Sequence, residues 1–219
     1  MMQDRTKSLY SLRKTPIQER SKATVEAVLE AGARLLLSIG YDKASTNKIA
    51  ELAGVSVGSL YEYFPGKEAI FAEMRRREAE RHYRMLMAEV VPTTLSEMLR
   101  LHVSTYIELI RTNVELHAAL IREVPDFATL GTESKIVSEY NARSNIFLSF
   151  QGSNIRPQCE THIVIELLTR VLRATINDYA MHAPERLEDS VVTDELLDML
   201  ERYLLQSKSS SHPHHAPQK

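Results

Sequence analysis

The chain has 219 residues, of which 43% are hydrophobic and 26% charged. This composition is typical of a globular protein and excludes a fibrous or wholly disordered chain. No apolar run approaches the roughly 20 residues of a membrane span, and the polar N-terminus lacks an apolar signal segment, so we expect a cytoplasmic protein without a membrane partner. The single cysteine, Cys159, excludes an intrachain disulfide and a multi-cysteine zinc site.

Charge is distributed unevenly around the formal net value of −2. Residues 1–77 hold 13 basic and 9 acidic side chains, whereas the remaining 142 residues hold 14 basic and 20 acidic ones. The basic N-terminal part, here called the front part, and the acidic remainder, the back part, indicate two functions. One of these functions would involve a polyanion. An asymmetry of this size is equally compatible with no functional division.

The front part begins with a polar, basic arm over residues 1–15. Apolar residues at helical spacing then predict four helices, over 21–38, 47–53, 57–64 and 67–89. Gly40 suits the end of the first helix, and Thr46 suits the N-cap of the second. Pro65-Gly66 separates the third from the fourth.

The back part shows helical spacing without strand alternation. It predicts helices over 95–111, 113–123, 132–150, 157–182 and 193–206, followed by a disordered tail from Ser207. The helix over 157–182 carries apolar residues almost all round and is expected to be buried on more than one side. The fold class is therefore all-α, with about nine helices.

Residues 46–64 have the length and the turn residues of a helix-turn-helix, in which two short helices are joined by a three-residue turn. Ile49, Leu52, Ala53, Val55, Leu60 and Phe64 are expected to pack inward. Gly58, Ser59, Tyr61 and Glu62 then point outward. A glycine lets the backbone approach a phosphate, and hydroxyl groups donate to phosphate oxygens. DNA binding and an ordinary corner between two helices are both compatible with this pattern.

The sequence from Thr46 to Glu68, TNKIAELAGVSVGSLYEYFPGKE, resembles the DNA-binding signature of TetR/AcrR transcriptional regulators. The resemblance covers about residues 20–72, and beyond it the chain matches only in length and helical character. It implies a three-helix helix-turn-helix domain over 1–67 with the basic arm, a helical ligand-binding and dimerisation domain over 68–206, and a tail over 207–219.

The resemblance also implies roles for individual residues. Its DNA-contacting positions correspond to Thr46, Asn47, Lys48, Ser56, Val57, Gly58, Ser59, Tyr61, Tyr63 and Lys67. Lys67 matches a lysine that binds phosphate at the start of the fourth helix. The arm either adds phosphate or minor-groove contacts or stays solvated. Arg75-Arg76-Arg77 is followed by acidic residues, which favours a solvated, ion-paired helix face over a nucleic-acid patch.

A ligand pocket is implied among the central helices. Its candidate lining residues are His102, Tyr106, His117, Phe127, Phe147, Phe150, His162, Arg170 and Asn177. Taken singly, each is more readily explained as a core residue. His162 and Glu166 have metal-ligand spacing, but two ligands are too few for a site. We therefore expect no metal and no cofactor.

The resulting hypothesis is a homodimeric, ligand-responsive transcriptional repressor that is released from a pseudo-palindromic, double-stranded operator by a lipophilic small molecule. The alternative is a regulator of the same fold without a small-molecule inducer, acting as an activator or through a protein partner. A third possibility is a helical enzyme or adaptor that has lost DNA binding. No nucleophile elbow, phosphate loop or dinucleotide fingerprint is found in the sequence, so we do not expect an enzyme.

Overall fold

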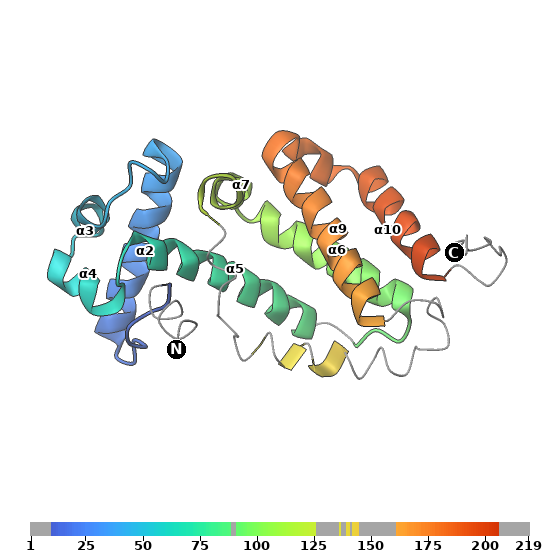
Figure 1. Ribbon diagram of the computed structural model, residues 1–219, viewed down its shortest axis with the longest axis horizontal. Helices are drawn as coiled ribbons and strands as arrows, with labels where there is room; N and C mark the ends of the chain where they lie inside the picture. The colour runs from blue at the N-terminus through green and yellow to red at the C-terminus, as the bar shows by residue number, and fades with distance from the viewer. Residues whose placement is uncertain are drawn as a thin grey trace, which may run out of the picture.

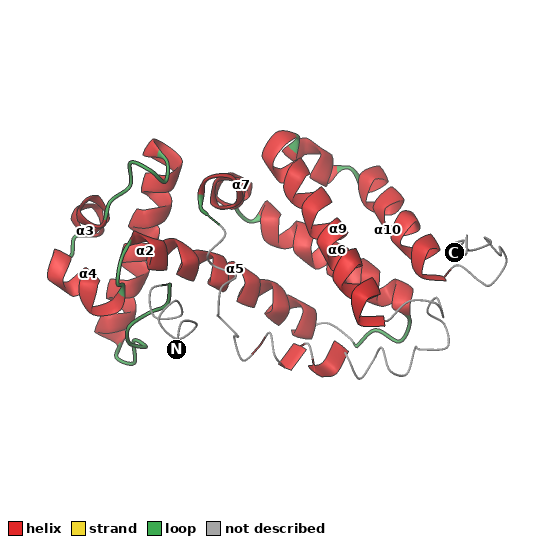
Figure 2. Ribbon diagram, in the orientation of Figure 1, coloured by secondary structure: helices red, strands yellow, loops and turns green. Residues whose placement is uncertain are grey.

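The computed structural model describes residues 10–88, 91–125, 136, 139–140, 142–144 and 161–205. Within these ranges the regular elements are eight α-helices and one 3-10 helix, with no strand (Figure 1). Helices account for nearly the whole described chain (Figure 2). The all-α prediction is confirmed. Among the described helices, none is long and apolar enough to cross a bilayer.

Four helices form the front part, and their bounds lie within two residues of those predicted. They are α2 (Glu19–Ile39), α3 (Thr46–Ala53), α4 (Val57–Tyr63) and α5 (Lys67–Ala88). The predicted cap of α3 is wrong by one residue, because Ser45, not Thr46, accepts the hydrogen bond from the Lys48 backbone N–H. Gly40 does follow the last residue of α2, with a positive φ of 79°.

The back part contains α6 (Leu95–Arg111), α7 (Val114–Glu123), α9 (Thr161–His182), the 3-10 helix η1 (Pro184–Glu188) and α10 (Ser190–Leu205). The sequence did not predict η1. Most of the helix expected over 132–150 lies outside the described residues, although the positions described there are helical. The predicted start at 157 and the tail from 207 also lie outside them.

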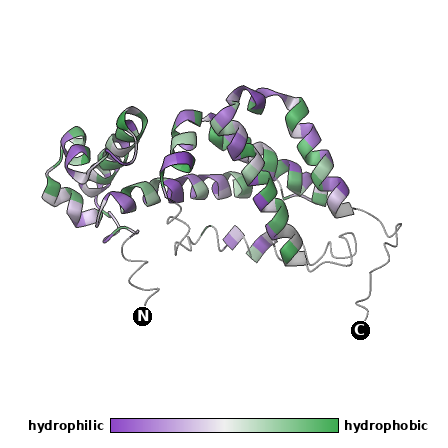
Figure 3. Ribbon diagram, turned by 45° about the horizontal axis from the view of Figure 1, so that its top comes forward, coloured by the Kyte–Doolittle hydropathy of each residue, from purple (hydrophilic) through white to green (hydrophobic). Residues whose placement is uncertain are grey.

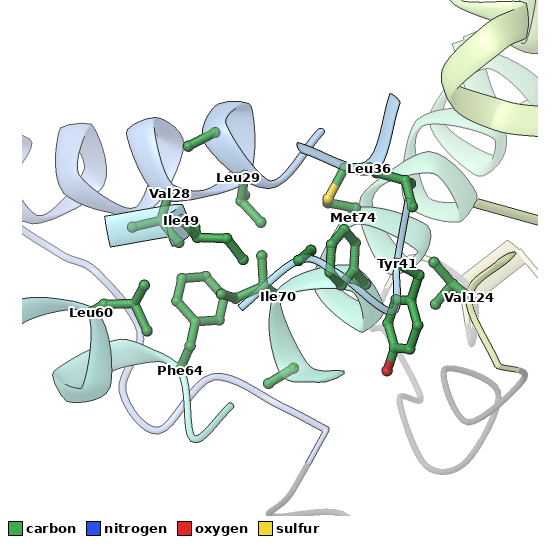
Figure 4. Close-up of a cluster of buried hydrophobic side chains, with 14 of the residues drawn as sticks. Val28, Leu29, Leu36, Tyr41, Ile49, Leu60, Phe64, Ile70, Met74 and Val124 are labelled. Atoms are coloured by element: carbon green, nitrogen blue, oxygen red, sulfur yellow. The ribbon is translucent and has the colours of Figure 1, made fainter. Parts of the chain in front are cut away.

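One hydrophobic core holds the front helices together. Ile49 of α3, Leu60 of α4 and Phe64 are fully buried against α2 and the first turns of α5 (Figure 4). Ala119, Leu120 and Val124, from α7 and its end, complete the same cluster. Leu52 was predicted to pack inward, but it is 45% exposed. Leu52 follows Ile49 by three residues, so it lies at the edge of the buried face, where its large apolar side chain reaches solvent.

A second core joins α6, α9, η1 and α10, and it includes Leu200, which is only 2% exposed. Hydrophobic and hydrophilic residues alternate along the helices (Figure 3), as expected when each helix buries one face. The long helix α5 runs from the first core to the second (Figure 1), contributing Met74 to one and Met85 to the edge of the other. It is the continuous connection between the two parts.

An ion-pair network fixes the middle of α5. The Glu73 carboxylate is only 3% exposed and accepts hydrogen bonds from Arg76 and Arg77. Arg77 also reaches Glu26 on α2 at 2.6 Å. The predicted ion pair of Arg76 with Glu80 is present, but the arginines are half-buried rather than solvated. Arg77 thus ties α5 to α2, whereas Arg76 forms its ion pairs within α5.

Gly54 is expected to matter for stability because it ends α3 in the left-handed conformation, with a φ of 67°. A Cβ at this position would meet no atom within 4 Å, so the cost of Gly54→Ala is purely conformational. We expect a loss of about 1–2 kcal/mol in the free energy of unfolding, measured by urea denaturation. An unchanged midpoint would contradict the turn geometry.

Candidate functional site

The helix α4 begins with a side-chain cap that also fixes two of the predicted DNA-contact residues. The Ser56 hydroxyl oxygen accepts a hydrogen bond from the Ser59 backbone N–H at 3.0 Å. The two hydroxyl groups are also hydrogen-bonded to each other, 2.8 Å apart. Capping of this kind stabilises a short helix. It holds the first turn of α4 rigid at the surface.

The exposed face of α4 carries several of the residues predicted to contact DNA. Val57 is 38% exposed, Tyr61 is 39% exposed, and Gly58 is also exposed. Tyr63 differs, because its ring is only 8% exposed and belongs to the hydrophobic core. Its assignment to the exposed face is therefore corrected: Tyr63 and Leu60, three residues apart, lie on the buried side of the helix.

The helix α3 contributes a second row of polar groups next to α4. The Thr46 and Tyr61 hydroxyl groups lie 3.0 Å apart and form a hydrogen bond between the two helices. Asn47 and Lys48 are exposed, and the Lys48 ammonium donates to the Lys43 carbonyl oxygen at 3.1 Å. The structure thus brings together the hydroxyl groups that the sequence assigned to phosphate contacts.

Lys67 lies at the start of α5, and its ammonium group is held in place. It donates to the Tyr41 carbonyl oxygen at 2.9 Å and lies 4.2 Å from the centroid of the Tyr41 ring. The lysine is half-buried and its charge is located between α5 and the loop before α3. A cation fixed in this way loses little side-chain entropy when it binds an anion.

The described end of the basic arm is attached to α4. The Arg13 backbone N–H donates to the Tyr63 carbonyl oxygen at 2.8 Å, and the Lys14 ammonium pairs with the Glu62 carboxylate at 2.7 Å. This pairing raises the pKa of Lys14 and lowers the pKa of Glu62, chiefly through their hydrogen bond. No sequence pattern indicates these contacts, because the paired residues are 48 positions apart.

A second set of polar groups lies inside the back part and includes four predicted pocket residues. The Asn177 side-chain oxygen accepts a hydrogen bond from the Tyr106 hydroxyl at 2.8 Å and lies 3.0 Å from His117 Nε2. The other ring nitrogen of His117 lies 3.3 Å from the Glu78 carboxylate. His102 is hydrogen-bonded to the Tyr140 hydroxyl. These residues form a buried polar cluster between α5, α6, α7 and α9.

The remaining pocket predictions are not part of this cluster. Arg170 is exposed and pairs with Glu166 along α9. Phe127, Phe147 and Phe150 lie outside the described residues, as does the side chain of His162. Conversely, His82 was not predicted from the sequence, although its Nε2 lies 3.2 Å from the Thr105 hydroxyl and its ring lies beside those of His102 and Tyr106.

A small apolar cavity adjoins the polar cluster. It has a volume of about 80 Å³, and its walls come from the end of α5, the start of α6 and the helical residues Tyr140, Arg143 and Ser144. Its lining includes Leu86, Met98 and Leu101, and the Tyr140 that binds His102. Apolar walls next to a few fixed polar groups are the usual features of a small-molecule site.

Burial makes the cluster sensitive to acid. It lowers the pKa of His82 to about 3 and the pKa of His102 to about 4, in both cases mainly because the charged ring loses its hydration. In the unfolded chain both rings bind protons near pH 6.5. The free energy of unfolding should therefore decrease as the pH falls below about 6.5, and continue to fall toward 4.

The measurement is urea denaturation across this pH interval. Carboxylates also lose stability in acid, so the comparison is with His102→Gln, which should show a weaker pH dependence than the natural chain. Identical pH dependence in both proteins would contradict the burial of a neutral His102.

The family model described as "Bacterial regulatory proteins, tetR family" matches residues 28–74 of the chain, from within α2 to the first part of α5. An uncharacterized HTH-type transcriptional regulator of Mycobacterium tuberculosis is 25% identical over 159 residues, which cover 70% of this chain and 81% of the relative. An HTH-type transcriptional repressor of the same species is 27% identical over 101 residues, which cover 46% of this chain and 52% of the relative.

Solved structures resemble the chain over most of its length. A TetR family transcription regulator from Marinobacter aquaeolei VT8 covers 87% of this chain and is itself covered completely, with a TM-score of 0.63 at 17% identity. NalD, the secondary repressor of the MexAB-OprM multidrug efflux pump in Pseudomonas aeruginosa, covers 87% of this chain and is likewise covered completely, with a TM-score of 0.61 at 20% identity. At these identities the likeness establishes the fold.

Proposed function

Because the chain belongs to the TetR family of bacterial regulatory proteins, we propose that it is a homodimeric repressor that leaves its operator DNA when a small molecule binds its back part. Transcriptional regulation through DNA binding is common to the family and its named relatives. The repressor assignment is supported by the relative that is named a transcriptional repressor. A protein with this task works where the chromosome lies, in the cytoplasm.

The observation that carries DNA binding is Gly58 on the exposed face of α4. A Cβ added there would meet only the Ser56 hydroxyl oxygen, at an ordinary contact distance of 3.8 Å, and the φ of Gly58 is not positive. Neither packing nor backbone conformation therefore requires a glycine. Glycine makes a helix less stable than alanine does. Because Gly58 is not needed for the fold, its presence supports a close approach of DNA to this face.

We assign DNA binding to residues 1–67 and ligand binding and dimerisation to residues 68–206, with 207–219 as a tail outside the described residues. The proposed DNA contacts are Thr46, Asn47, Lys48, Ser56, Val57, Gly58, Ser59, Tyr61 and Lys67. The first core supports a boundary slightly further along α5, since it includes Met74.

Dimerisation is supported by apolar side chains that the single chain leaves in solvent. Ile163 and Leu167 of α9 are 53% and 46% exposed, and Val191 and Met199 of α10 are 62% and 50% exposed. The two helices lie side by side (Figure 1). Exposed apolar groups on neighbouring helices are typical of a surface that a partner covers. A second copy would bury them in a two-fold interface.

Small-molecule binding is supported by the buried polar cluster and the adjoining apolar cavity. Tyr106, His117 and Asn177 supply fixed hydrogen-bonding groups, and Leu86, Met98 and Leu101 supply apolar contacts. This combination suits a lipophilic molecule with few polar atoms, which must widen the cavity as it binds, because ligand pockets usually begin at about 300 Å³. In the alternative, the chain has no inducer and these groups only stabilise the fold. The experiment must distinguish this alternative from ligand binding.

The decisive experiment is a gel shift and footprint with the DNA upstream of the chain's own gene. We expect a protected pseudo-palindrome whose half-site centres lie about 34–36 Å apart, or a multiple of this. A thermal-shift screen of lipophilic compounds then identifies ligands, which must weaken the DNA complex. A footprint without two-fold symmetry would contradict the dimer, and ligands without effect on DNA would favour regulation through a protein partner.

Lys67 should contribute to DNA affinity through charge alone. Lys67→Met keeps an aliphatic stem over the Tyr41 ring but removes the ammonium group. We expect weaker binding to all DNA sequences alike, and a salt dependence whose slope falls by about 0.9 for each phosphate that the ammonium group neutralises. Fluorescence anisotropy over a series of salt concentrations measures the slope.

The matched control for this variant is Arg100→Met, which removes one positive charge from α6, away from the helix-turn-helix. Arg100 is 62% exposed and faces Asp194 on α10. This control should leave the slope unchanged. A slope that is equally unaffected in Lys67→Met would show that Lys67 does not reach a phosphate.

A further inference from the structure

A second and larger cavity, outside the proposed effector site, lies where the two parts of the molecule meet. It has a volume of about 320 Å³ and is lined by the last turns of α2 and α9, by α7 and by Pro184. Its apolar walls include Leu36, Leu37, Ala118 and Met181. Pockets that bind small ligands begin at about this size. We call it the junction cavity.

The charges around the junction cavity favour a cation. Its polar lining consists of two carboxylates, Glu115 and Glu123, and one guanidinium, Arg122. Arg122 already pairs with Glu123 at 2.8 Å, so the lining carries one excess negative charge. The hydrogen bond from Arg122 lowers the pKa of Glu123, which keeps this carboxylate charged at neutral pH.

Helix ends add to this negative potential. Leu36 and Leu37 lie in the last turn of α2, and Met181 lies in the last turn of α9. The C-terminal end of a helix carries the negative end of its dipole and its last carbonyl oxygens. Two such ends lie at the cavity, together with the N-terminal end of α7 at Val114 and Glu115, whose dipole has the opposite sign. The two C-terminal ends outnumber the single N-terminal end, which favours a positive charge.

The junction cavity is connected to Lys67, the proposed phosphate contact, through a single residue, Tyr41. A Glu123 carboxylate oxygen accepts a hydrogen bond from the Tyr41 backbone N–H at 3.1 Å. The Tyr41 carbonyl oxygen in turn accepts one from the Lys67 ammonium at 2.9 Å. Tyr41 and Val124 lie at the same end of the first core (Figure 4), so α7 and the loop before α3 are in direct contact.

Gly40 makes this contact possible. A Cβ at Gly40 would lie only 3.0 Å from the Glu123 carboxylate oxygen, and its φ is 79°. The glycine thus permits both the turn at the end of α2 and the close approach of Glu123. A shift of Glu123 would consequently move the Tyr41 backbone, which holds Lys67.

We propose that the junction cavity is a binding site for a compact organic ammonium compound, whose apolar body packs against Leu36, Ala118 and Met181. Its ammonium group pairs with Glu123, and the charge of Glu115 adds to the attraction. An ammonium group bound to Glu123 competes with the Tyr41 N–H for the carboxylate. Release of Tyr41 loosens the loop that positions Lys67, so DNA binding weakens. Only the weakening of DNA binding rests on the proposed function. The site is separate from the polar cluster around Asn177.

Binding is tested on the full chain by calorimetry with three probes of similar shape and different charge. They are phenethylammonium, the neutral 2-phenylethanol and the anionic phenylacetate. We expect phenethylammonium to bind at least about fivefold more tightly than the alcohol, and phenylacetate not to bind. Equal affinities for the amine and the alcohol, or no heat from the amine up to about 10 mM, would overturn the proposal.

Three variants locate the binding. Glu123→Gln should weaken phenethylammonium at least about fivefold, since a charged hydrogen bond is lost. Glu115→Gln should weaken it to a smaller extent, since it removes a nearby charge. Glu108→Gln is the matched control, because Glu108 is an exposed carboxylate on α6 that does not line the cavity. It should bind the amine like the natural chain. Unchanged affinity in both cavity variants would place the amine elsewhere and refute the site.

The effect of the bound amine on Tyr41 is measured by hydrogen exchange on the free protein, in the absence of DNA. Phenethylammonium should accelerate hydrogen exchange of the Tyr41 amide, which the Glu123 carboxylate otherwise protects. It should also weaken operator binding about fivefold or more. A bound amine that leaves both Tyr41 exchange and DNA affinity unchanged would refute the coupling. A chain that binds no DNA at all would refute the proposed function instead, with calorimetry and exchange still reporting on the cavity.

Discussion

Leu167→Asp and Met199→Asp should each convert the dimer into monomers and weaken operator binding by about a hundredfold or more. Both side chains are about half exposed in the single chain, so an aspartate there does not disturb the protomer's own core. In a two-fold interface the new carboxylate would meet apolar groups of the second copy and remain desolvated without a partner. Two linked recognition helices gain about a hundredfold or more in affinity over one, and this gain is lost with the dimer.

Sedimentation velocity measures the oligomeric state and anisotropy measures the affinity. Ile17→Asp is the matched control, because Ile17 is 83% exposed and lies before α2, outside α9 and α10. It should remain a dimer. If Leu167→Asp and Met199→Asp also sediment as dimers, the interface is located on another face.

Leu200 illustrates what the sequence could not reveal about this interface. The last helix carries many apolar residues in the sequence, but this pattern does not distinguish a residue buried in the protomer from one buried between protomers. Leu200 is 2% exposed and packs in the second core, whereas its neighbour Met199 is half exposed. Leu200→Asp would therefore unfold the chain rather than separate two copies.

The positions of the helices were predictable because they depend on local features. Apolar spacing located α2 to α7 within about two residues, and Pro65-Gly66 separated α4 from α5. Helix faces were less certain where apolar residues occur on both sides. Leu52 and Tyr63 were each assigned to the wrong side: Leu52 is exposed, and Tyr63 is buried below the Lys14 ammonium.

The contacts that define the candidate sites could not be predicted, since they join residues far apart in the sequence. His117 approaches Asn177 over a separation of 60 residues and Glu78 over 39. Lys67 meets the Tyr41 carbonyl across 26 residues, and Glu123 reaches the Tyr41 N–H across 82. Each pair depends on how two helices pack, which no local pattern specifies.

Gly58→Ala should change stability and DNA affinity in opposite directions. The added methyl group has room in the free protein, where its nearest neighbour is the Ser56 hydroxyl oxygen at 3.8 Å. Because alanine restricts the unfolded chain more than glycine does, the free energy of unfolding should rise by about 0.4–1 kcal/mol. In the proposed complex the same methyl group stands between the backbone of α4 and the DNA.

We expect the Gly58→Ala protein to bind its operator at least about tenfold more weakly, which corresponds to about 1.4 kcal/mol. The rise in stability, measured by urea denaturation, is the internal control: a protein that is more stable and binds less DNA has not lost affinity through unfolding. Serine at position 58 should weaken binding further, because its side chain is larger. An alanine variant with undiminished affinity would show that the face containing Gly58 and Tyr61 does not lie against the DNA, and would leave the glycine at this exposed position unexplained.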